Sequence, residues 1–88
     1  MILLGVILMT IVEATKQRIE ELCYERGLKF CRLATISGVP YTTVKSFIYN
    51  QSKNPSIITI KKICDGLEIS ITDFFDTDTF RNLEQEIK

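Results

Sequence analysis

Apolar residues recur at helical spacing along most of the chain, with polar residues in the intervening positions. Gly, Pro, Ser and Asn interrupt this pattern at intervals that are typical of helix ends and turns. The sequence therefore predicts an all-α fold of five helices. They are expected at residues 11 or 15 to 26, 30 to 37, 40 to 49, from the cap at residue 56 onward, and 70 to 75.

Each predicted helix carries one apolar side, and 88 residues leave room for a single core that removes about 60% of the unfolded surface from water. Thr10 with Glu13, and Ser70 with Asp73, have the spacing of capping boxes, and Ser56 is expected to cap the fourth helix. The residues predicted to face the core are Ile19, Leu22, Cys23, Leu28, Leu33, Ala34, Val44, Phe47, Ile57, Ile60, Ile63 and Cys64.

The segment from residue 30 to residue 49 reads FCRLATISGVPYTTVKSFIY and predicts two helices that cross over a tight turn. Ala34 leaves room for the second helix to cross closely, and Gly38 can adopt a positive φ where the first helix ends. Val44 and Phe47 are expected to anchor the second helix to the core. Its opposite face is then free to contact a partner.

This segment resembles the helix-turn-helix of the Cro/repressor family, also called the xenobiotic-response-element-like family. The resemblance extends from about Ala14 to about Phe75, with IEELCYERGLKF upstream and NPSIITIKKICDGLEISITDFF downstream. It implies a compact five-helix lambda-repressor-like DNA-binding domain. The expected division is an apolar N-terminal arm at residues 1–10, the DNA-binding domain at 11–76 with its helix-turn-helix at 30–49, and a C-terminal tail or short helix at 77–88.

The outer face of the second helix of this motif holds the residues expected to read DNA. Because Val44 and Phe47 point inward, a turn of 100° per residue places Tyr41, Thr42, Lys45 and Ser46 outward. The resemblance implies base reading by Tyr41, Thr42 and Ser46, while Lys45 can reach a guanine edge or a phosphate. The positions that match the family's sugar-phosphate contacts are Thr43, Asn50, Ser52, Lys53 and Asn54.

Two departures from the family pattern affect this interpretation. Many relatives carry Gln or Arg at the reading positions, whereas Tyr41 and Thr42 offer hydroxyls and apolar contact with thymine methyls, which favours T-rich steps and readout of DNA shape. The family often has a Ser or Thr cap and a phosphate-binding Gln where this chain has Lys29 and Phe30. Lys29 can still neutralise a phosphate, and Phe30 is expected to pack inward or against the turn.

The net charge is zero, with 11 basic and 11 acidic residues, but the two signs are unevenly distributed. Every charged residue from Arg26 to Lys62 is basic, and seven acids lie between Asp65 and the C-terminus. A basic segment that coincides with the predicted reading helix is expected for phosphate contact, because Lys and Arg release condensed counterions from DNA. The alternative is a solvated charged face.

The residue types give no sign of catalysis or of a metal site. Cys23, Cys31 and Cys64 lack the two-residue spacing of a zinc or redox motif, and the chain has no His. Cys23 and Cys64 are expected in the core, the alternative being a redox or metal sensor that acts mainly through Cys31. The sequence lacks a Gly-rich phosphate loop and a nucleophile beside a base, so no enzymatic activity, cofactor or metal is predicted. The cysteine usage favours the cytoplasm.

The two ends of the chain are expected to support association. MILLGVILMTIV is almost wholly apolar, but it is too short to span a bilayer and lacks the basic start of a signal peptide. We expect it to pair with a second copy or to pack on a neighbouring subunit, the alternative being its own domain. The tail TDTFRNLEQEIK has Phe80, Leu83 and Ile87 at helical spacing and is either a further helix that supports pairing or a frayed end.

These features predict a bacterial or phage-type transcriptional regulator that binds double-stranded DNA as a homodimer. Its reading helix enters the major groove of an operator, and the bound protein either blocks RNA polymerase or contacts it. Two such helices in successive major grooves, about 34 Å apart, require a roughly palindromic site. The alternative from another class is a protein-interaction module, antitoxin-like or an adaptor, in which the apolar arm carries the activity.

Overall fold

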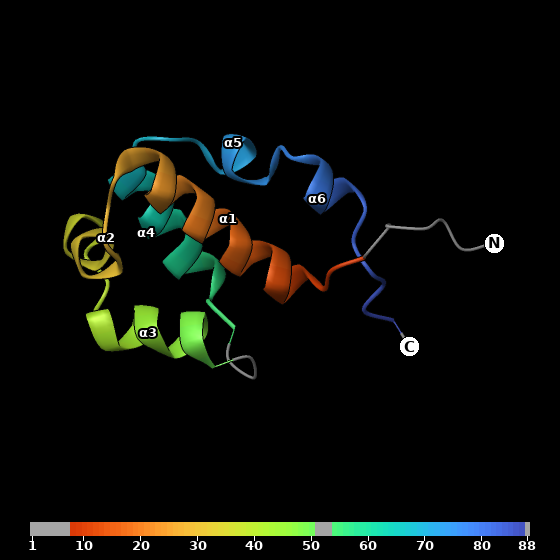
Figure 1. Ribbon diagram of the computed structural model, residues 1–88, viewed down its shortest axis with the longest axis horizontal. Coiled ribbons are helices and arrows are strands. Elements are labelled where there is room, and N and C mark those ends of the chain that lie inside the picture. The colour runs from red at the N-terminus through yellow and green to blue at the C-terminus, as the bar shows by residue number, and fades with distance from the viewer. Residues whose placement is uncertain (1–7, 51–53, 88) are drawn as a thin grey trace.

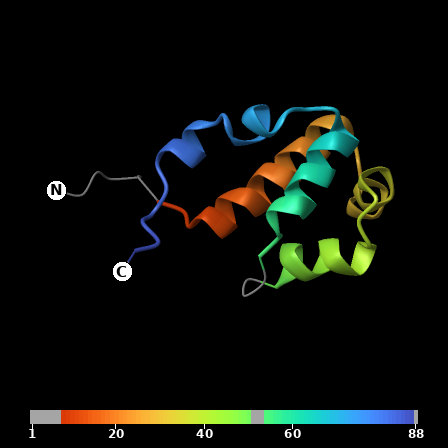
Figure 2. The same ribbon diagram turned by 180° about the vertical axis from the view of Figure 1, so that it is seen from behind.

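The computed structural model describes residues 8–50 and 54–87, and in this part of the chain every regular element is a helix. The helices are α1 (Ile11–Arg26), α2 (Phe30–Ser37), α3 (Tyr41–Tyr49), α4 (Ile57–Leu67), α5 (Ile71–Phe75) and α6 (Asp78–Arg81). α2 packs against both α3 and α4, α3 runs along the lower edge of the molecule, and α5 and α6 lie at the upper edge (Figures 1 and 2). The all-α prediction is confirmed, and α6 adds a short helix to the five expected.

Three helices begin at the caps that the sequence predicts. Thr10 and Glu13 form a complete capping box, in which the Glu13 N–H donates to Thr10 Oγ1 at 3.1 Å and the Thr10 N–H donates to Glu13 Oε1 at 3.0 Å. The hydroxyls of Ser56 and Ser70 each accept the N–H of the residue three positions later, at 3.1 and 2.9 Å. These bonds satisfy donors that a first helical turn leaves unpaired, which fixes the starts of α1, α4 and α5.

One core joins the first five helices. Its buried apolar residues are Ile19, Leu22, Cys23, Leu33, Ala34, Val39, Val44, Phe47, Ile48, Ile60, Ile63, Cys64, Leu67 and Phe74. Leu28 is half-buried against them, and the predicted inward position of Ile57 is wrong, because its side chain is 65% exposed. Ile57 is the first residue of α4 and borders an open apolar groove with Ile11, Pro55 and Phe75.

α4 passes closely over the end of α2. A Cβ atom on Gly66 would lie 2.6 Å from Ser37 Oγ and 2.8 Å from the carbonyl oxygen of Ile36, so only glycine fits here without a shift of one helix. Because α2 leads into the turn before α3, this contact fixes the position of the helix-turn-helix on the core.

α1 also holds the end of α5. The guanidinium of Arg18 donates to the carbonyl oxygens of Phe74, at 2.7 Å, and Asp73, at 3.0 Å. Both carbonyls belong to the last turn of α5, and the charged donor makes each bond stronger than a neutral one. α5 is therefore fixed at the edge of the molecule opposite α3 (Figure 1).

The segment after α5 forms only a short helix, which does not extend to Leu83 and Ile87. α6 ends at Arg81, and the Glu84 N–H donates to the carbonyl oxygen of Met9 at 2.9 Å, which ties the tail to the residues before α1. Phe80 packs against the rings of Phe74 and Phe75, whereas Ile87 is 89% exposed. A helix of four residues is too short to be stable without packing, and the tail offers apolar partners only near its start.

The N-terminal arm is described only from Leu8, whose side chain is exposed. The predicted pairing of this arm concerns mainly residues 1–7, which lie outside the described residues. Among the residues that are described, no helix is both long and apolar enough to cross a membrane.

Candidate nucleic-acid interface

The turn between α2 and α3 has the geometry that the sequence predicts. Gly38 has a φ of 66° and ends α2 in the left-handed conformation, which costs glycine little because it has no Cβ. The Val39 N–H donates to the carbonyl oxygen of Ala34 at 3.0 Å, and Pro40 directly precedes α3. The two helices are therefore held at a defined angle by a turn of three residues.

α3 is attached to the core by one side. Val44, Phe47 and Ile48 are buried, so the inward orientation predicted for the first two is confirmed, while Ile48 was not predicted. The four residues expected on the outer face do lie there: Tyr41, Thr42 and Lys45 are exposed and Ser46 is half-buried. This orientation leaves the polar atoms of these four residues accessible to a partner.

One flank of α3 carries only small hydroxyl side chains. We call Thr42, Thr43 and Ser46 the hydroxyl flank. They line a groove with Asn54, Ser56 and Thr59, which come from the segment before α4 and from its first turn. Ser56 and Thr59 are hydrogen-bonded to each other, with 3.0 Å between the two hydroxyl oxygens. The groove therefore presents hydroxyl and amide groups from two neighbouring elements.

The other flank of α3 carries two rings and a cation. We call Tyr41, Lys45 and Tyr49 the aromatic flank, because the spacing of four residues aligns them along the helix. Lys45 Nζ lies 5.4 Å from the centre of the Tyr41 ring, a cation–π arrangement. Tyr41 and Tyr49 line a second groove with Lys29 and Phe30 at the start of α2.

Tyr49 is a surface residue for which the sequence predicted no role. Its side chain is 69% exposed, and its ring meets Phe30 in an edge-to-face contact with 6.3 Å between centres and 80° between planes. Phe30 itself packs partly against the core, as expected. The signal that could have placed Tyr49 is its spacing of eight residues from Tyr41, which puts both rings on the same side of a helix.

The predicted backbone contacts lie around this surface. Thr43 and Asn54 border the groove beside the hydroxyl flank, and Lys29 is exposed beside the aromatic flank, where it precedes α2 without a side-chain capping bond. Asn50 follows α3, and its N–H donates to the carbonyl oxygen of Ser46 at 3.1 Å. The predictions for Ser52 and Lys53 fall outside the described residues.

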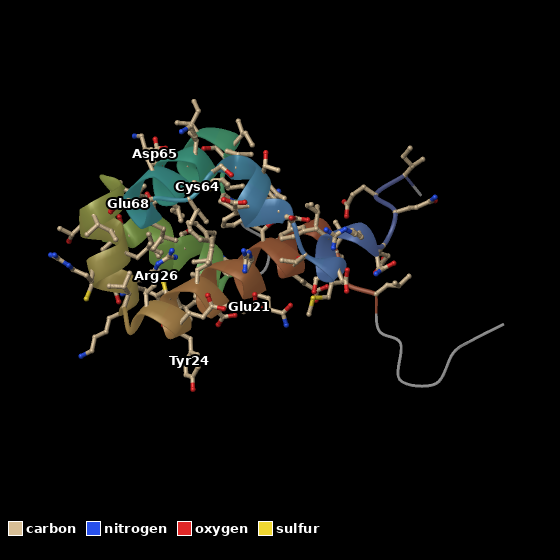
Figure 3. All side chains as sticks on the ribbon, turned by 90° about the horizontal axis from the view of Figure 1, so that it is seen from above. Glu21, Tyr24, Arg26, Cys64, Asp65 and Glu68 are labelled. Carbon is tan, nitrogen blue, oxygen red and sulfur yellow. The ribbon has the colours of Figure 1, made fainter. Side chains whose placement is uncertain are left out.

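The cations near α3 are free of acidic partners. Within the described residues, the ion pairs involve Arg18, Lys61 and Arg81, and none of them involves Lys29 or Lys45. Asp65 and Glu68 lie at the end of α4 (Figure 3), whereas Glu20 borders the groove beside the aromatic flank. Lys29 and Lys45 are therefore the cations beside α3 that would attract a polyanion.

Two of the three cysteines belong to the core. Burial raises the pKa of the Cys23 thiol and that of the Cys64 thiol, so both remain neutral at physiological pH, as expected for small apolar residues. Cys31 is exposed on α2. The described part of the chain contains no group of three Cys, Asp or Glu residues that could hold a metal ion.

Comparisons with known proteins agree with this geometry. The chain is similar to prophage Lp1 protein 11, known from a crystal structure, with 34% sequence identity over 86% of this chain and 100% of that chain and a TM-score of 0.75. None of the curated proteins matches the chain. The family model for the Cro/C1-type helix-turn-helix DNA-binding domain matches residues 18–79, and the limits of 11–76 expected for this domain stay a prediction. The chain belongs to the Cro/C1-type helix-turn-helix family, and its general function is that of a DNA-binding, non-enzymatic regulator.

Proposed function

We propose that this protein is a sequence-specific transcriptional regulator that places α3 in the major groove of an operator. The observation that carries the proposal is the arrangement of α3, which is fixed to the core by Val44 and Phe47 and exposes an outer face bordered by unpaired cations. The major groove of B-DNA is about 12 Å wide and admits an α-helix.

Base reading is assigned to Tyr41, Thr42, Lys45 and Ser46. The Thr42 methyl and the Tyr41 ring offer apolar contact to thymine, and the hydroxyls of Thr42 and Ser46 can donate to or accept from base edges. Lys45 is held over the Tyr41 ring and is directed to a guanine edge or a phosphate. A mismatch at one base pair of such a site would cost on the order of 1–3 kcal/mol.

Backbone contacts on the two sides of the groove fix the register of α3. Thr43 and Asn54, which border the hydroxyl flank, are assigned to the sugar-phosphate backbone. The same role is assigned to Asn50, Ser52 and Lys53. Lys29 is assigned to the backbone beside the aromatic flank. Contacts of this kind position the protein without reading sequence.

The regulator is of bacterial or phage type and acts as a homodimer in the cytoplasm. Two copies of α3 placed about 34 Å apart would occupy successive major grooves on one side of the duplex, and so select a roughly palindromic operator. Occupancy of that operator would then regulate transcription by blocking RNA polymerase or by contacting it.

Selection from a randomised duplex pool tests the proposal. The purified protein is equilibrated with the pool at two salt concentrations, the bound fraction is sequenced, and affinity for the enriched site is measured by fluorescence anisotropy. We expect a palindromic site whose affinity falls as salt rises. A triple variant with Tyr41, Thr42 and Ser46 changed to Ala should bind without sequence preference. If the protein enriches no site and binds weakly at both salt concentrations, the proposal is wrong and a protein-interaction module becomes the better hypothesis.

A further inference from the structure

The C-terminal end of α3 carries an exposed ring that the base-reading residues above do not include. Tyr49 is 69% exposed, which is more than Tyr41 at 43%, although both belong to the aromatic flank. We propose that Tyr49 is an additional specificity-determining residue, whose ring contacts the C5-methyl group of a thymine at the outer end of each half-site. This inference rests on the proposed function.

The position of Tyr49 along α3 fits such a contact. A helix rises 1.5 Å per residue, so the eight residues from Tyr41 to Tyr49 span about 12 Å. Stacked base pairs are about 3.4 Å apart along the duplex axis, so two rings separated by this distance can contact different base pairs. If Tyr41 reads a base near one end of a half-site, Tyr49 can reach a base pair that the other reading residues do not.

The ring of Tyr49 is held in place from behind. Its edge-to-face contact with Phe30 joins the last residue of α3 to the first residue of α2. Such a pair fixes the plane of the ring and reduces the rotamer entropy that a contact with DNA would otherwise cost. An exposed ring that is held in one orientation is suited to selecting one base position.

The chemistry of the flank favours a thymine methyl as the contacted group. The C5-methyl of thymine is the apolar group in the major groove, and the Tyr49 ring is the largest exposed apolar surface of α3. The groove beside it also contains Glu20, a carboxylate that would disfavour a phosphate close by, although Lys29 lies in the same groove. Ring contact with a base therefore fits better than a hydroxyl contact with the backbone.

Tyr24 provides a matched control. It borders the same groove and is 88% exposed, but it belongs to α1 and projects into solvent from that helix (Figure 3). Tyr24 and Tyr49 are thus both exposed tyrosines beside this groove. Only Tyr49 lies on the outer face of α3.

Replacement of single thymines by deoxyuridine tests the proposal, because it removes the methyl group and leaves every hydrogen-bonding group in place. The site selected by the wild-type protein is synthesised with deoxyuridine at one thymine at a time, and affinities are measured for the wild type and for Tyr49→Ala, Tyr49→Phe and Tyr24→Ala. We expect one outer position in each half-site where loss of the methyl weakens wild-type binding about fourfold, as for one buried carbon group. Tyr49→Ala should lose this sensitivity at that position alone, while Tyr49→Phe and Tyr24→Ala keep it.

Several outcomes would overturn the inference. A selected site without thymine beyond its inner base pairs would do so, as would a Tyr49→Ala variant that keeps the wild-type sensitivity at every position. Equal and uniform weakening by Tyr49→Phe and Tyr49→Ala would show a hydroxyl contact with the backbone instead. Each of these results is obtained on a DNA site that the wild-type protein has already selected, so none of them contradicts the proposed function. Failure of the selection itself contradicts the proposed function.

Discussion

The two flanks of α3 differ in the kind of contact they can make. The hydroxyl flank offers small, neutral donors and acceptors beside the first turn of α4, and the aromatic flank offers rings and a cation beside the start of α2. Neutral hydrogen bonds depend little on salt, whereas a cation near a phosphate contributes through counterion release. Under the proposed function, the same helix would combine two modes of recognition that can be separated by experiment.

The flanks also differ in what supports them. The hydroxyl flank borders α4, while the aromatic flank borders α2 through Phe30. Both depend on the same buried side of α3. A change in the core should therefore remove both flanks together, a change in the turn after α2 should disturb them unequally, and a change at the surface should affect one alone.

Removal of the core anchor should have the largest effect. Phe47 is almost fully buried, and its side chain anchors α3 to the core. Phe47→Ala should therefore lower the free energy of unfolding by about 3–5 kcal/mol. A domain of this size is stable by about 4–13 kcal/mol, so the variant should be marginal and should bind DNA weakly through either flank. Urea denaturation followed by circular dichroism measures the loss.

Ile58→Ala is the control for that measurement. Ile58 is a large apolar residue that is 65% exposed on α4, and its truncation should change stability by no more than about 0.5 kcal/mol. Equal losses for the two variants would contradict the assignment of Phe47 as the anchor.

The buried side of α3 was easier to predict than its flanks. Val44 and Phe47 follow from helical periodicity, because burial selects apolar residues at a fixed spacing. Gly38 and the hydroxyl caps at Thr10, Ser56 and Ser70 follow from local backbone chemistry. The helix order could therefore be predicted without long-range information.

The flanks depend on contacts between distant segments, which a single sequence does not reveal. Tyr49 was not among the residues predicted to contact DNA, because an aromatic residue at the end of a helix is compatible with burial or with exposure. Its position is decided by Phe30, nineteen residues earlier. Ile57 was misplaced for the same reason, since periodicity cannot tell whether the neighbouring helix reaches as far as the first turn of α4.

A change in the turn should have an intermediate effect that differs between the flanks. Gly38 and Gly27 both have a positive φ, 66° and 62°, and a Cβ on either would meet no atom within 4 Å. An alanine at either position should therefore cost about 1–2 kcal/mol through backbone strain alone. Only Gly38 lies between α2 and α3, so Gly38→Ala should also weaken DNA binding and shift preference at base pairs read by the aromatic flank. If the two variants lose the same stability but Gly38→Ala loses more affinity for DNA than Gly27→Ala, the result agrees with this comparison. Equal affinities of the two variants would contradict it.

Single surface substitutions on α3 should have the smallest effect on DNA affinity, but each should affect one flank alone. Lys45→Gln should reduce the slope of log affinity against log salt by about 0.9, because one fewer counterion is released. Thr43→Val removes the hydroxyl and keeps the volume of the side chain. It should therefore weaken binding by about 0.5–1.5 kcal/mol at every salt concentration and leave the slope unchanged. Lys16→Gln, a charge change on α1 away from α3, is the control for net charge. Anisotropy titrations on the selected site at four salt concentrations measure all three slopes. If Lys45→Gln shifts the affinities in parallel, Lys45 reads a base and the cation of the aromatic flank makes no phosphate contact.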